Sequence, residues 1–323
     1  MTTSSDFPVD VIIPTYNSMP YLKEAIESVI KQTHHNWLLY VVDDGSTDNG
    51  ATAEYVKGIA DHRVTYIKNP KKGRSAARNY GLKRSKSPYV AFLDSDDIWY
   101  PAKLQKQLAL LTEDKQLGMV YGLCKVIDET GRITSKIADN KRGDLFKYLL
   151  SGNNISGSAS IVMLRREVFE EIGAFREDFA MAEDWELWLR VARSYTIDYV
   201  PEFLAAYRVG AASSRPKFLE KARGLDYALP IMIDEFELGP LNRARLASAC
   251  LGQACSLYLD GNDRQSARQA FIRMLSYNPL AWLTPNRHRL FVYLRLLLGN
   301  PVLRFLRYRF SKQYRARETG KYD

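Results

Sequence analysis

The chain has 323 residues, of which 46% are hydrophobic and 26% charged, a balance that excludes an intrinsically disordered or collagen-like chain. Its 46 lysines and arginines outnumber its 37 aspartates and glutamates, and the net charge of +9 indicates an anionic partner. Ten of the basic and two of the acidic residues lie in 286–323, so most of the excess belongs to the C-terminal end.

The first hundred residues alternate between strand and helix patterns. A helical period of apolar residues begins at Pro20, and Arg74–Ser85 is a second predicted helix. Four runs rich in β-branched and aromatic residues predict strands: Val9–Ile13, which Pro14 closes, Trp37–Val42, Val64–Ile67 and Tyr89–Leu93. This order predicts an α/β fold with a Rossmann-like, mostly parallel sheet flanked by helices.

The later part of the chain changes from mixed elements to helices only. Ser213–Pro216 is the predicted linker between a domain of residues 1–215 and an α-helical C-terminal region of residues 216–323. In that region, Ala254–Pro279 has the spacing of a packed helical hairpin or of a single tetratricopeptide-like unit. The expected elements before the linker are the hairpin strands Met119–Ile127 and Ile133–Ile137, the strand Ser158–Leu164, the helix Arg166–Ile172 ended by Gly173, the helix Glu183–Arg193, and strands at Thr196–Val200 and Phe203–Val209.

Polar clusters follow three of the predicted strands, at Pro14–Asn17, Asp43–Ser46 and Asp94–Asp97. Ligands of parallel α/β sheets bind outside the carboxyl ends of the strands, so these clusters form a candidate site. Asp94 and Asp96 carry the hard oxygen ligands that suit Mg²⁺ or Mn²⁺ beside phosphate groups. The alternative is that they only cap the following helix.

Other residues in these segments suit a nucleotide. A carboxylate of the Asp43–Asp44 turn could accept hydrogen bonds from a base or ribose, although such residues are common in ordinary turns. Tyr16 could stack on a nucleobase. The guanidinium of Arg78 could bind phosphate oxygens as a fork, or it could be an exposed arginine on a helix face.

A third group of acidic residues opens the predicted helix at Glu183. Carboxylates at a helix start are often only partners of the helix dipole. Here Trp185 and Trp188 could surround one carboxylate with apolar groups, which would raise its pKa and make it a general base. A base that deprotonates an acceptor hydroxyl while a diphosphate leaves from the opposite face implies displacement in one step, with inversion.

Five motifs occur in a characteristic order: VIIPTYN (residues 11–17), VVDDGSTD (41–48), ARN (77–79), FLDSDD (92–97) and EDWELW (183–188). Together they resemble the motifs of inverting glycosyltransferases of family 2, over about residues 7–210. The resemblance implies a GT-A fold and a transferase that moves a sugar from a nucleotide-diphosphate donor, by default a UDP-sugar, to an acceptor hydroxyl. It also implies a divalent metal, Mg²⁺ or Mn²⁺.

The resemblance further implies roles for individual residues. Asp96 would be the metal ligand and Asp184 the general base, with Glu183 and Trp185 on the acceptor side. Gly157–Ser160 would form a small-residue loop under the donor sugar. The residues expected to bind the nucleotide sugar are Pro14, Tyr16, Asn17, Asp43, Asp44, Arg78 and Asp94.

One position departs from the family pattern. Many relatives carry a metal-binding histidine shortly after a Tyr-Arg pair, but here Tyr207 and Arg208 are followed by Val209 and Gly210. We therefore expect Asp96, the diphosphate and water to hold the metal.

The basic end contains two apolar, arginine-studded segments, Leu290–Leu298 and Val302–Phe310. The second is amphipathic, which suits an anionic membrane surface, or a helix packed on the protein. No nucleic-acid reader module accompanies it, so no nucleic acid is expected.

Residues 1–6 show no secretory signal, no apolar run is long enough to span a bilayer, and three cysteines fit a reducing compartment. We predict a cytoplasmic protein, peripheral on the inner face of the cell membrane.

The predicted function is therefore inverting sugar transfer in the assembly of a bacterial surface polysaccharide or lipid-linked glycan. The alternative is a catalytically silent scaffold that binds a nucleotide sugar and recruits partners through its helical C-terminal region. A nucleotidyltransferase is disfavoured, because residues 14–19 lack the glycine- and lysine-rich phosphate loop that such an enzyme needs.

Overall fold

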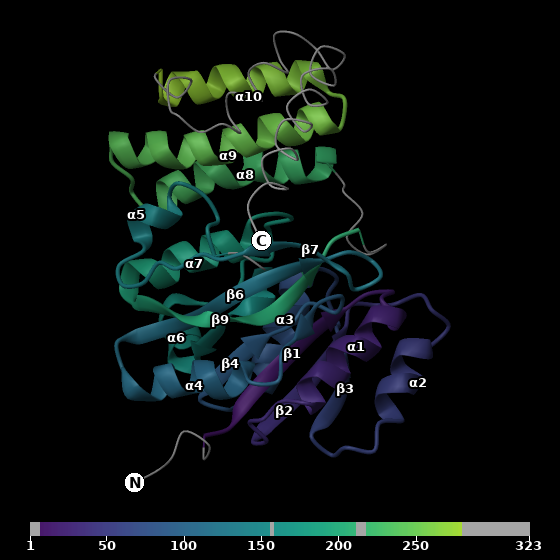
Figure 1. Ribbon diagram of the computed structural model, residues 1–323. Helices are drawn as coiled ribbons and strands as arrows, with labels where there is room; N and C mark the ends of the chain where they lie inside the picture. Colours follow the sequence, from purple (N-terminus) through teal and green to yellow (C-terminus); the bar gives the residue numbers. More distant parts are fainter. Residues whose placement is uncertain (1–6, 156–157, 211–217, 280–323) are drawn as a thin grey trace, which may run out of the picture. The chain divides into compact units, whose positions relative to one another are not determined.

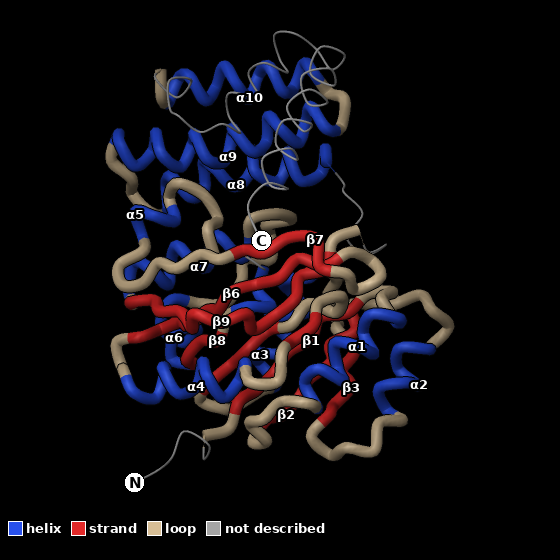
Figure 2. Tube along the Cα trace, viewed as in Figure 1, coloured by secondary structure: helices blue, strands red, loops and turns tan. Residues whose placement is uncertain are grey.

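The structure is a computed structural model that describes residues 7–155, 158–210 and 218–279 (Figure 1). The chain divides into two compact units, Met1–Pro216 and Lys217–Asp323. A β-sheet with flanking helices makes up the N-terminal unit, and the described part of the C-terminal unit is helical (Figure 2).

Nine strands form one sheet in the N-terminal unit: β1 (Val9–Thr15), β2 (Trp37–Asp43), β3 (Val64–Lys68), β4 (Tyr89–Phe92), β5 (Ile98–Trp99), β6 (Leu117–Ile127), β7 (Ile133–Ile137), β8 (Met163–Arg165) and β9 (Thr196–Arg208). Their order is β3-β2-β1-β4-β8-β6-β9-β5, with β7 paired to β6. The first four are parallel neighbours and form the Rossmann-like part of the sheet. In the other part, β6 and β9 are parallel, while β8, β5 and β7 pair antiparallel with their neighbours.

Seven α-helices and a short 3₁₀ turn are described in this unit: α1 (Met19–Ile30), α2 (Ala51–Lys57), α3 (Arg74–Arg84), α4 (Lys103–Glu113), α5 (Phe146–Leu149), η2 (Ser158–Ile161), α6 (Arg166–Ile172) and α7 (Glu183–Ser194). All seven residues of β1 are buried, as is typical of a central parallel strand. Helix α1 buries Leu22, Ile26 and Val29, which share one helical face.

Helix α3 lies against the sheet at Gly81. A Cβ atom at that position would lie 2.6 Å from Cγ2 of Ile12, so glycine is what permits this close approach. Because α3 connects the parallel strands β3 and β4, it runs back along the sheet, and its first turn lies at the carboxyl ends of the strands. Arg74 in this turn and Arg78 in the next are thereby brought to the edge where the candidate site is expected.

Two predicted strand boundaries are wrong. Pro14 does not close the first strand, because β1 continues to Thr15 in register with β2. Strand β4 pairs with β1 only as far as Ile12, so beyond it β1 has a neighbour on one side only, where a residue without N–H is tolerated. The two strands expected after α7 are the single strand β9, whose register against β6 shifts to accommodate Pro201 and Glu202.

The predicted strand Ser158–Leu164 is also wrong. Its first half is the 3₁₀ turn η2, and only Met163–Arg165 forms a strand. The backbone carbonyls of residues 160–162 accept hydrogen bonds from buried side chains instead of from a neighbouring strand. A pattern of apolar residues does not distinguish these two kinds of partner, since both bury the segment.

The described part of the C-terminal unit contains the helices α8 (Phe218–Glu235), α9 (Pro240–Asp260) and α10 (Arg264–Tyr277), and α9 packs against both of the others. The predicted helical hairpin is present as the end of α9 and α10. Asp226 of α8 joins all three helices, because it accepts hydrogen bonds from the Tyr258 hydroxyl (2.8 Å) and the Arg273 guanidinium (3.0 Å). The predicted linker and the basic residues 286–323, with both of their apolar segments, lie outside the described residues.

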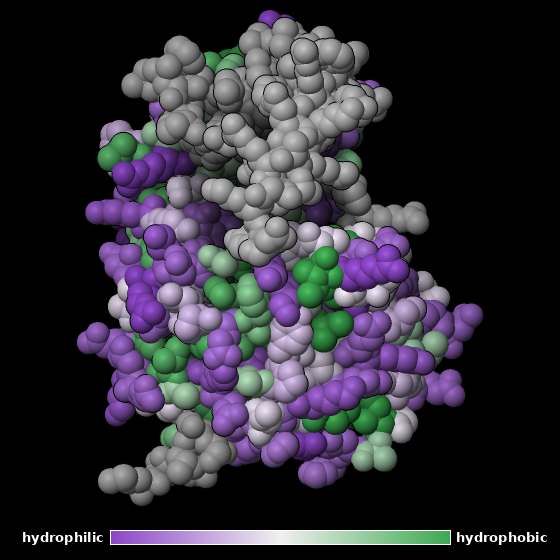
Figure 3. Space-filling view, viewed as in Figure 1, coloured by the Kyte–Doolittle hydropathy of each residue, from purple (hydrophilic) through white to green (hydrophobic). Residues whose placement is uncertain are grey.

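Polar residues cover most of one face of the N-terminal unit. On the face shown in Figure 3, hydrophilic residues predominate and hydrophobic ones form small, separate groups. Among the described residues, no helix is both long enough and apolar enough to cross a membrane.

Candidate active site

Three neighbouring strands end beside one another at the carboxyl edge of the sheet. Thr15 of β1 is in register with Asp43 of β2, and the backbone N–H of Leu93, just after β4, donates to the carbonyl of Ile12. The residues that follow these strands are those that the sequence singled out, Tyr16, Asn17, Asp44 and Asp94. The expectation that the polar clusters share one edge of the sheet is confirmed.

Hydrogen bonds to both carboxylates fix the Asp43–Asp44 turn. Asp44 accepts hydrogen bonds from the Gly73 backbone N–H (2.9 and 3.0 Å to its two oxygens) and from Asn69 (2.8 Å), so its carboxylate holds the start of α3. Asp43 is buried and accepts from the Ser46 N–H (2.8 Å) and the Tyr66 hydroxyl (2.7 Å). Burial and the Asp43 carboxylate raise the pKa of Tyr66, so this phenol stays a donor.

Tyr16 and Asn17 form the other side of this turn. Asn17 has a positive φ of 50°, and its side chain accepts from the Thr47 N–H (2.8 Å) and donates to the Thr47 hydroxyl (3.1 Å). These bonds fix the β1 loop to the β2 loop. Tyr16 is 52% exposed and therefore accessible to a ligand, whereas Pro14 is buried within β1.

Arg78 is the centre of a buried ion-pair network. Its side chain is 1% exposed and donates to Asp94 (2.6 Å) and to Glu183 (3.1 Å). Its Nε–H has no hydrogen-bond partner among the described residues. One guanidinium thus connects α3, the end of β4 and the start of α7, which are far apart in the sequence.

Arg74 lies one turn before Arg78 and is 55% exposed, with its guanidinium 3.6 Å from Glu183. The pKa of Arg74 is raised, first by the charge of Glu183 and then by those of Asp94, Asp184 and Tyr207. An arginine that interacts with all of these groups lies between the β4 end, α7 and β9. The motifs did not indicate Arg74, although its position four residues before Arg78 places both on one helix face.

The acidic loop, which we define as Asp94–Asp97, is bound by the hydroxyl of Ser160. The Ser160 hydroxyl donates to Asp97 (2.5 Å) and accepts from the backbone N–H of Asp94 (2.9 Å). Burial, followed by the charges of Asp96 and Asp94, raises the pKa of Asp97 well above its usual range. Asp97 and Ser160 lie in two segments that the sequence singled out, but the hydrogen bond that joins them was not predicted.

Asp184 lies half-buried in the first turn of α7. The helix begins after Ala182, which has a φ of 66°, and the Asp184 carboxylate accepts from the Trp185 N–H (2.7 Å). Burial and the charge of Glu183 raise the pKa of Asp184 to about 6, against the opposing effects of Arg78 and of that N–H. The side chain of Trp185 is buried and donates to the carbonyl of Leu149 (2.8 Å), so it forms part of the wall beside Asp184 and does not point into solvent.

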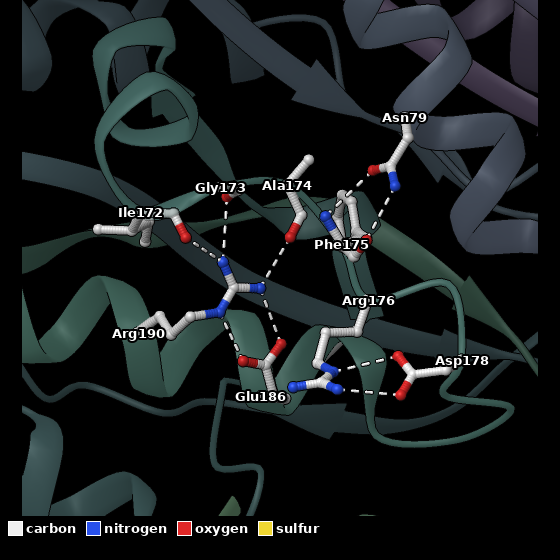
Figure 4. A network of polar contacts seen from close by, with 9 residues as sticks. All are labelled: Asn79, Ile172, Gly173, Ala174, Phe175, Arg176, Asp178, Glu186 and Arg190. Carbon is white, nitrogen blue, oxygen red and sulfur yellow. Dashed lines mark hydrogen bonds and ion pairs between the residues drawn. The ribbon is translucent and has the colours of Figure 1, made fainter. Parts of the chain in front are cut away.

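A second network fixes the segment that leads into α7 (Figure 4). Glu186 holds Arg190 through two hydrogen bonds of 2.5 and 2.8 Å, and Arg190 donates to the carbonyls of residues 172–174. The next residue, Phe175, bonds through its backbone to both ends of the Asn79 amide (2.8 and 3.0 Å). Helix α3 is therefore joined to this segment through Asn79 as well as through Arg78.

Arg208 joins the acidic loop to β9. It is buried, and it donates to the carbonyl of Asp96 through Nε (2.9 Å) and to Asp97 through its backbone N–H (2.9 Å). Gly210, where the resemblance led us to look for a histidine, has a φ of 88°, and a Cβ atom there would lie 3.1 Å from Oε1 of Glu129. A side chain at this position would be strained and would meet Glu129.

The carboxylates of this site can supply only some of the ligands of a divalent cation. In the residues that the structure describes, no group of three or more His, Cys, Asp or Glu side chains is arranged to bind a metal. Asp94 and Asp96 nevertheless lie close enough to Asp97 to affect its pKa, so negative charge is concentrated here. This donor set fits Mg²⁺ or Mn²⁺, which take one or two carboxylates and complete their shell with water and substrate phosphate.

Gly157, in the predicted small-residue loop, lies outside the described residues, while Ala159 and Ser160 are buried.

The family model of glycosyl transferase family 2 matches residues 10–173, half of the chain. The chain belongs to this family. A glucosyltransferase of Escherichia coli, "UDP-Glc:alpha-D-GlcNAc-diphosphoundecaprenol beta-1,3-glucosyltransferase WfgD", is 32% identical over 74% of this chain and 90% of its own length. An uncharacterized glycosyltransferase of Rickettsia felis is 33% identical over 64% of this chain, which spans only 36% of that protein.

Solved structures of glycosyltransferases have the same fold. TarS 1–349 of S. aureus superposes with a TM-score of 0.60 at 19% identity, covering 89% of this chain and 86% of that one; its complex with UDP-GlcNAc gives 0.52. The mannosyltransferase PcManGT of Pyrobaculum calidifontis, solved with GDP-Man and Mn²⁺, gives 0.51 at 18% identity, over 90% of this chain and 87% of its own. The predicted GT-A fold with an α-helical C-terminal extension is confirmed.

Proposed function

We propose that this family 2 protein transfers a sugar from a nucleoside diphosphate donor to an acceptor hydroxyl, with inversion at the sugar. The observation that carries the proposal is Asp184, a half-buried carboxylate with a pKa of about 6 beside Arg74 and Arg78, the arginines that also interact with Asp94. A base near neutrality and a cationic place for a diphosphate therefore lie together, as such a displacement requires.

The donor is proposed to bind across the ends of β1, β2 and β4. Tyr16 would stack on the nucleobase, because its ring is exposed, and Asp44 would line the nucleoside pocket. Asn17, Asp43 and the buried Pro14 would shape that pocket through the contacts described above. UDP is the first candidate, because TarS was solved with UDP-GlcNAc.

Arg74 and Arg78 are proposed to have different roles in binding the diphosphate sugar. The two terminal nitrogens of Arg78 already donate to carboxylates, so its main role would be to hold Asp94 toward the sugar and Glu183 toward the acceptor. Arg74 is exposed and interacts with the same acids at longer range. We assign it to the phosphate oxygens.

Asp96, with Asp94 beside it, is proposed to hold the divalent cation. The cation would supply positive charge to the diphosphate oxygens as the sugar departs. Mn²⁺ and Mg²⁺ are both suitable, and Mn²⁺ is supported by its presence with GDP-Man in the mannosyltransferase structure. Arg208, which donates to the Asp96 carbonyl, would keep this residue in place.

In the proposed reaction, an acceptor oxygen attacks the anomeric carbon, the bond from that carbon to the diphosphate breaks, and the hydroxyl proton passes to Asp184. Glu183 and Trp185 would set the position of this carboxylate. The acceptor class that we favour is a lipid-linked glycan, since WfgD is named for a diphosphoundecaprenol substrate. The basic end of the chain would then hold the protein at the anionic inner face of the cell membrane.

The pH dependence of transfer should report Asp184. Because a general base must be deprotonated, we expect kcat/KM to rise with pH up to about 6 and to level off above it, with about a tenfold loss for each pH unit below. Initial rates between pH 4.5 and 8, after a check that the protein remains folded at each pH, measure this. A profile that is flat between pH 5 and 7 would remove Asp184 from the role of base.

The proposed function is tested with a panel of UDP-, GDP- and dTDP-sugars and undecaprenyl diphosphate-linked acceptors, with Mn²⁺, with Mg²⁺ or with EDTA. We expect one donor class to give a glycosylated product of inverted anomeric configuration, and EDTA to abolish its formation. Retention of configuration would contradict the single-base mechanism. Tight donor binding without any product across the panel would favour the nucleotide-sugar-binding scaffold instead.

A further inference from the structure

Three consecutive backbone carbonyls, those of residues 160–162, are each bound by a buried side chain. The donors come from β5 and α4, and we call them the carbonyl clamp: Trp99, Lys103 and Gln107. The hydrogen bonds are Trp99 Nε1 to Ser160 (2.7 Å), Gln107 Nε2 to Ile161 (2.7 Å) and Lys103 Nζ to Val162 (3.2 Å). This explains how η2 can be buried although it is not part of a strand.

Lys103 is the unusual member of the clamp. It is fully buried, and burial lowers its pKa well below the usual range for a lysine. Its amine donates to the Gln107 side-chain carbonyl (2.7 Å) and to Val162, and it lies 4.0 Å from the centre of the Trp99 ring. Both of these acceptors are neutral, so the amine is hydrogen-bonded inside the protein by uncharged groups.

The hydrogen bonds of Ser160 connect the clamp to the acidic loop. The Trp99 indole binds the carbonyl of Ser160, while the hydroxyl of Ser160 binds the Asp94 N–H and the Asp97 carboxylate. These two contacts lie on either side of Asp96. A shift of the 160–162 backbone would therefore move the support on which both ends of the acidic loop rest.

We infer that Lys103 is a positioning residue for cation binding, which acts through the 160–162 backbone and Ser160 on the loop that carries Asp96. The inference rests on the proposed role of Asp96 as a metal ligand. The hydrogen bonds of Lys103 and Gln107 reach the 160–162 backbone, so we expect their effect on the acidic loop to pass through Ser160 and through Trp99. Residues that orient metal ligands in this way commonly change metal affinity when they are replaced.

The test is a double-mutant cycle read by Mn²⁺ affinity. Wild type, Lys103→Met, Ser160→Ala and the double variant are titrated with Mn²⁺ at saturating UDP, and free Mn²⁺ is measured by electron paramagnetic resonance. We expect each single variant to weaken Mn²⁺ binding about tenfold. The double variant should bind Mn²⁺ no more weakly than the more strongly affected of the two single variants, because both changes break the same connection. Lys106→Met, the same substitution at a half-buried position of α4 that pairs with Glu202, should bind Mn²⁺ like wild type.

A merely structural role for Lys103 predicts a different result, namely a lower melting temperature with unchanged Mn²⁺ affinity of the folded protein. That result, or strictly additive effects in the cycle, would overturn the inference. Wild-type protein that binds no Mn²⁺ would instead refute the proposed metal site itself, and the inference with it. If Lys103→Met does not fold, Trp99→Phe replaces it in the cycle, since it removes one N–H and retains most of the ring.

Discussion

Asp184→Asn is expected to lower kcat for sugar transfer by about 10²–10⁴-fold, because the amide cannot accept the proton of the acceptor hydroxyl. Donor affinity should remain within about threefold of wild type, since the substitution keeps the size of the side chain and the arginines are unchanged. Steady-state kinetics and calorimetric titration with the donor measure the two quantities. Asp178→Asn, at an exposed aspartate of the preceding loop that pairs with Arg176, is the matched control and should keep full activity.

The same substitution should stabilise the protein. The pKa of Asp184 is about 6 in the folded state, above its ordinary value of 3.8, so the folded state binds this proton more tightly than the unfolded state. As the pH rises from about 4 to 6 that advantage is lost, and at pH 7.5 the ionised carboxylate costs stability. Asp184→Asn removes the charge, and we expect a gain of about 1–3 kcal/mol at pH 7.5 but little gain at pH 4. A variant that kept its activity would contradict the role of Asp184 as base. A variant that was destabilised at pH 7.5 would contradict its raised pKa.

Arg78→Met should have the largest effect on stability. It leaves the carboxylates of Asp94 and Glu183 close together without the buried guanidinium that binds both, and breaking a buried ion pair in this way costs roughly 3–5 kcal/mol. Urea denaturation at pH 7.5 measures the change. Removing the Arg78 charge should also raise the pKa of Asp184 further, so the pH at which any remaining activity is half-maximal should move upward.

Arg74→Met is the matched comparison, since it removes the same group one turn earlier on the same helix. Its ion pair with Glu183 is long and its side chain is exposed, so the free energy of unfolding should fall by less than about 1 kcal/mol. The donor KM, however, should rise by about tenfold or more, because a charged hydrogen bond to phosphate is lost. Equal destabilisation by the two variants would contradict the assignment of Arg78 to holding carboxylates and Arg74 to holding the donor.

Much of the fold follows from local patterns. The strands β1, β2 and β4 are rich in apolar residues, and a parallel sheet with helical connections brings their ends together whatever the details of packing. That is why the positions of Tyr16, Asp44 and Asp94 along the carboxyl edge could be predicted. The wrong extent of β1 at Pro14 has the same origin, because the pattern does not reveal that β4 stops pairing two residues earlier.

The interior contacts of the site could not be predicted in this way. Ser160 bonds to Asp97 and Trp99, which lie about sixty residues earlier in the chain, and no local pattern indicates such a partner. Lys103 is on an amphipathic helix, where a lysine is ordinarily expected to face water. Its amine binds the Val162 carbonyl, just after η2, and the Gln107 side chain, and the distant Val162 cannot be recognised from the local sequence.

The contacts of Arg78 bear on how the site is assembled during synthesis of the protein. Arg78 of α3 and Asp94, just after β4, are made early, but Glu183 and Asp184 follow about ninety residues later. A nascent chain that ends near residue 173, where the match to the family model also ends, would carry the guanidinium with one of its two carboxylate partners missing and without the proposed base. Expression of that shared core alone should therefore yield a weakened fold, and the site would close only when α7 docks.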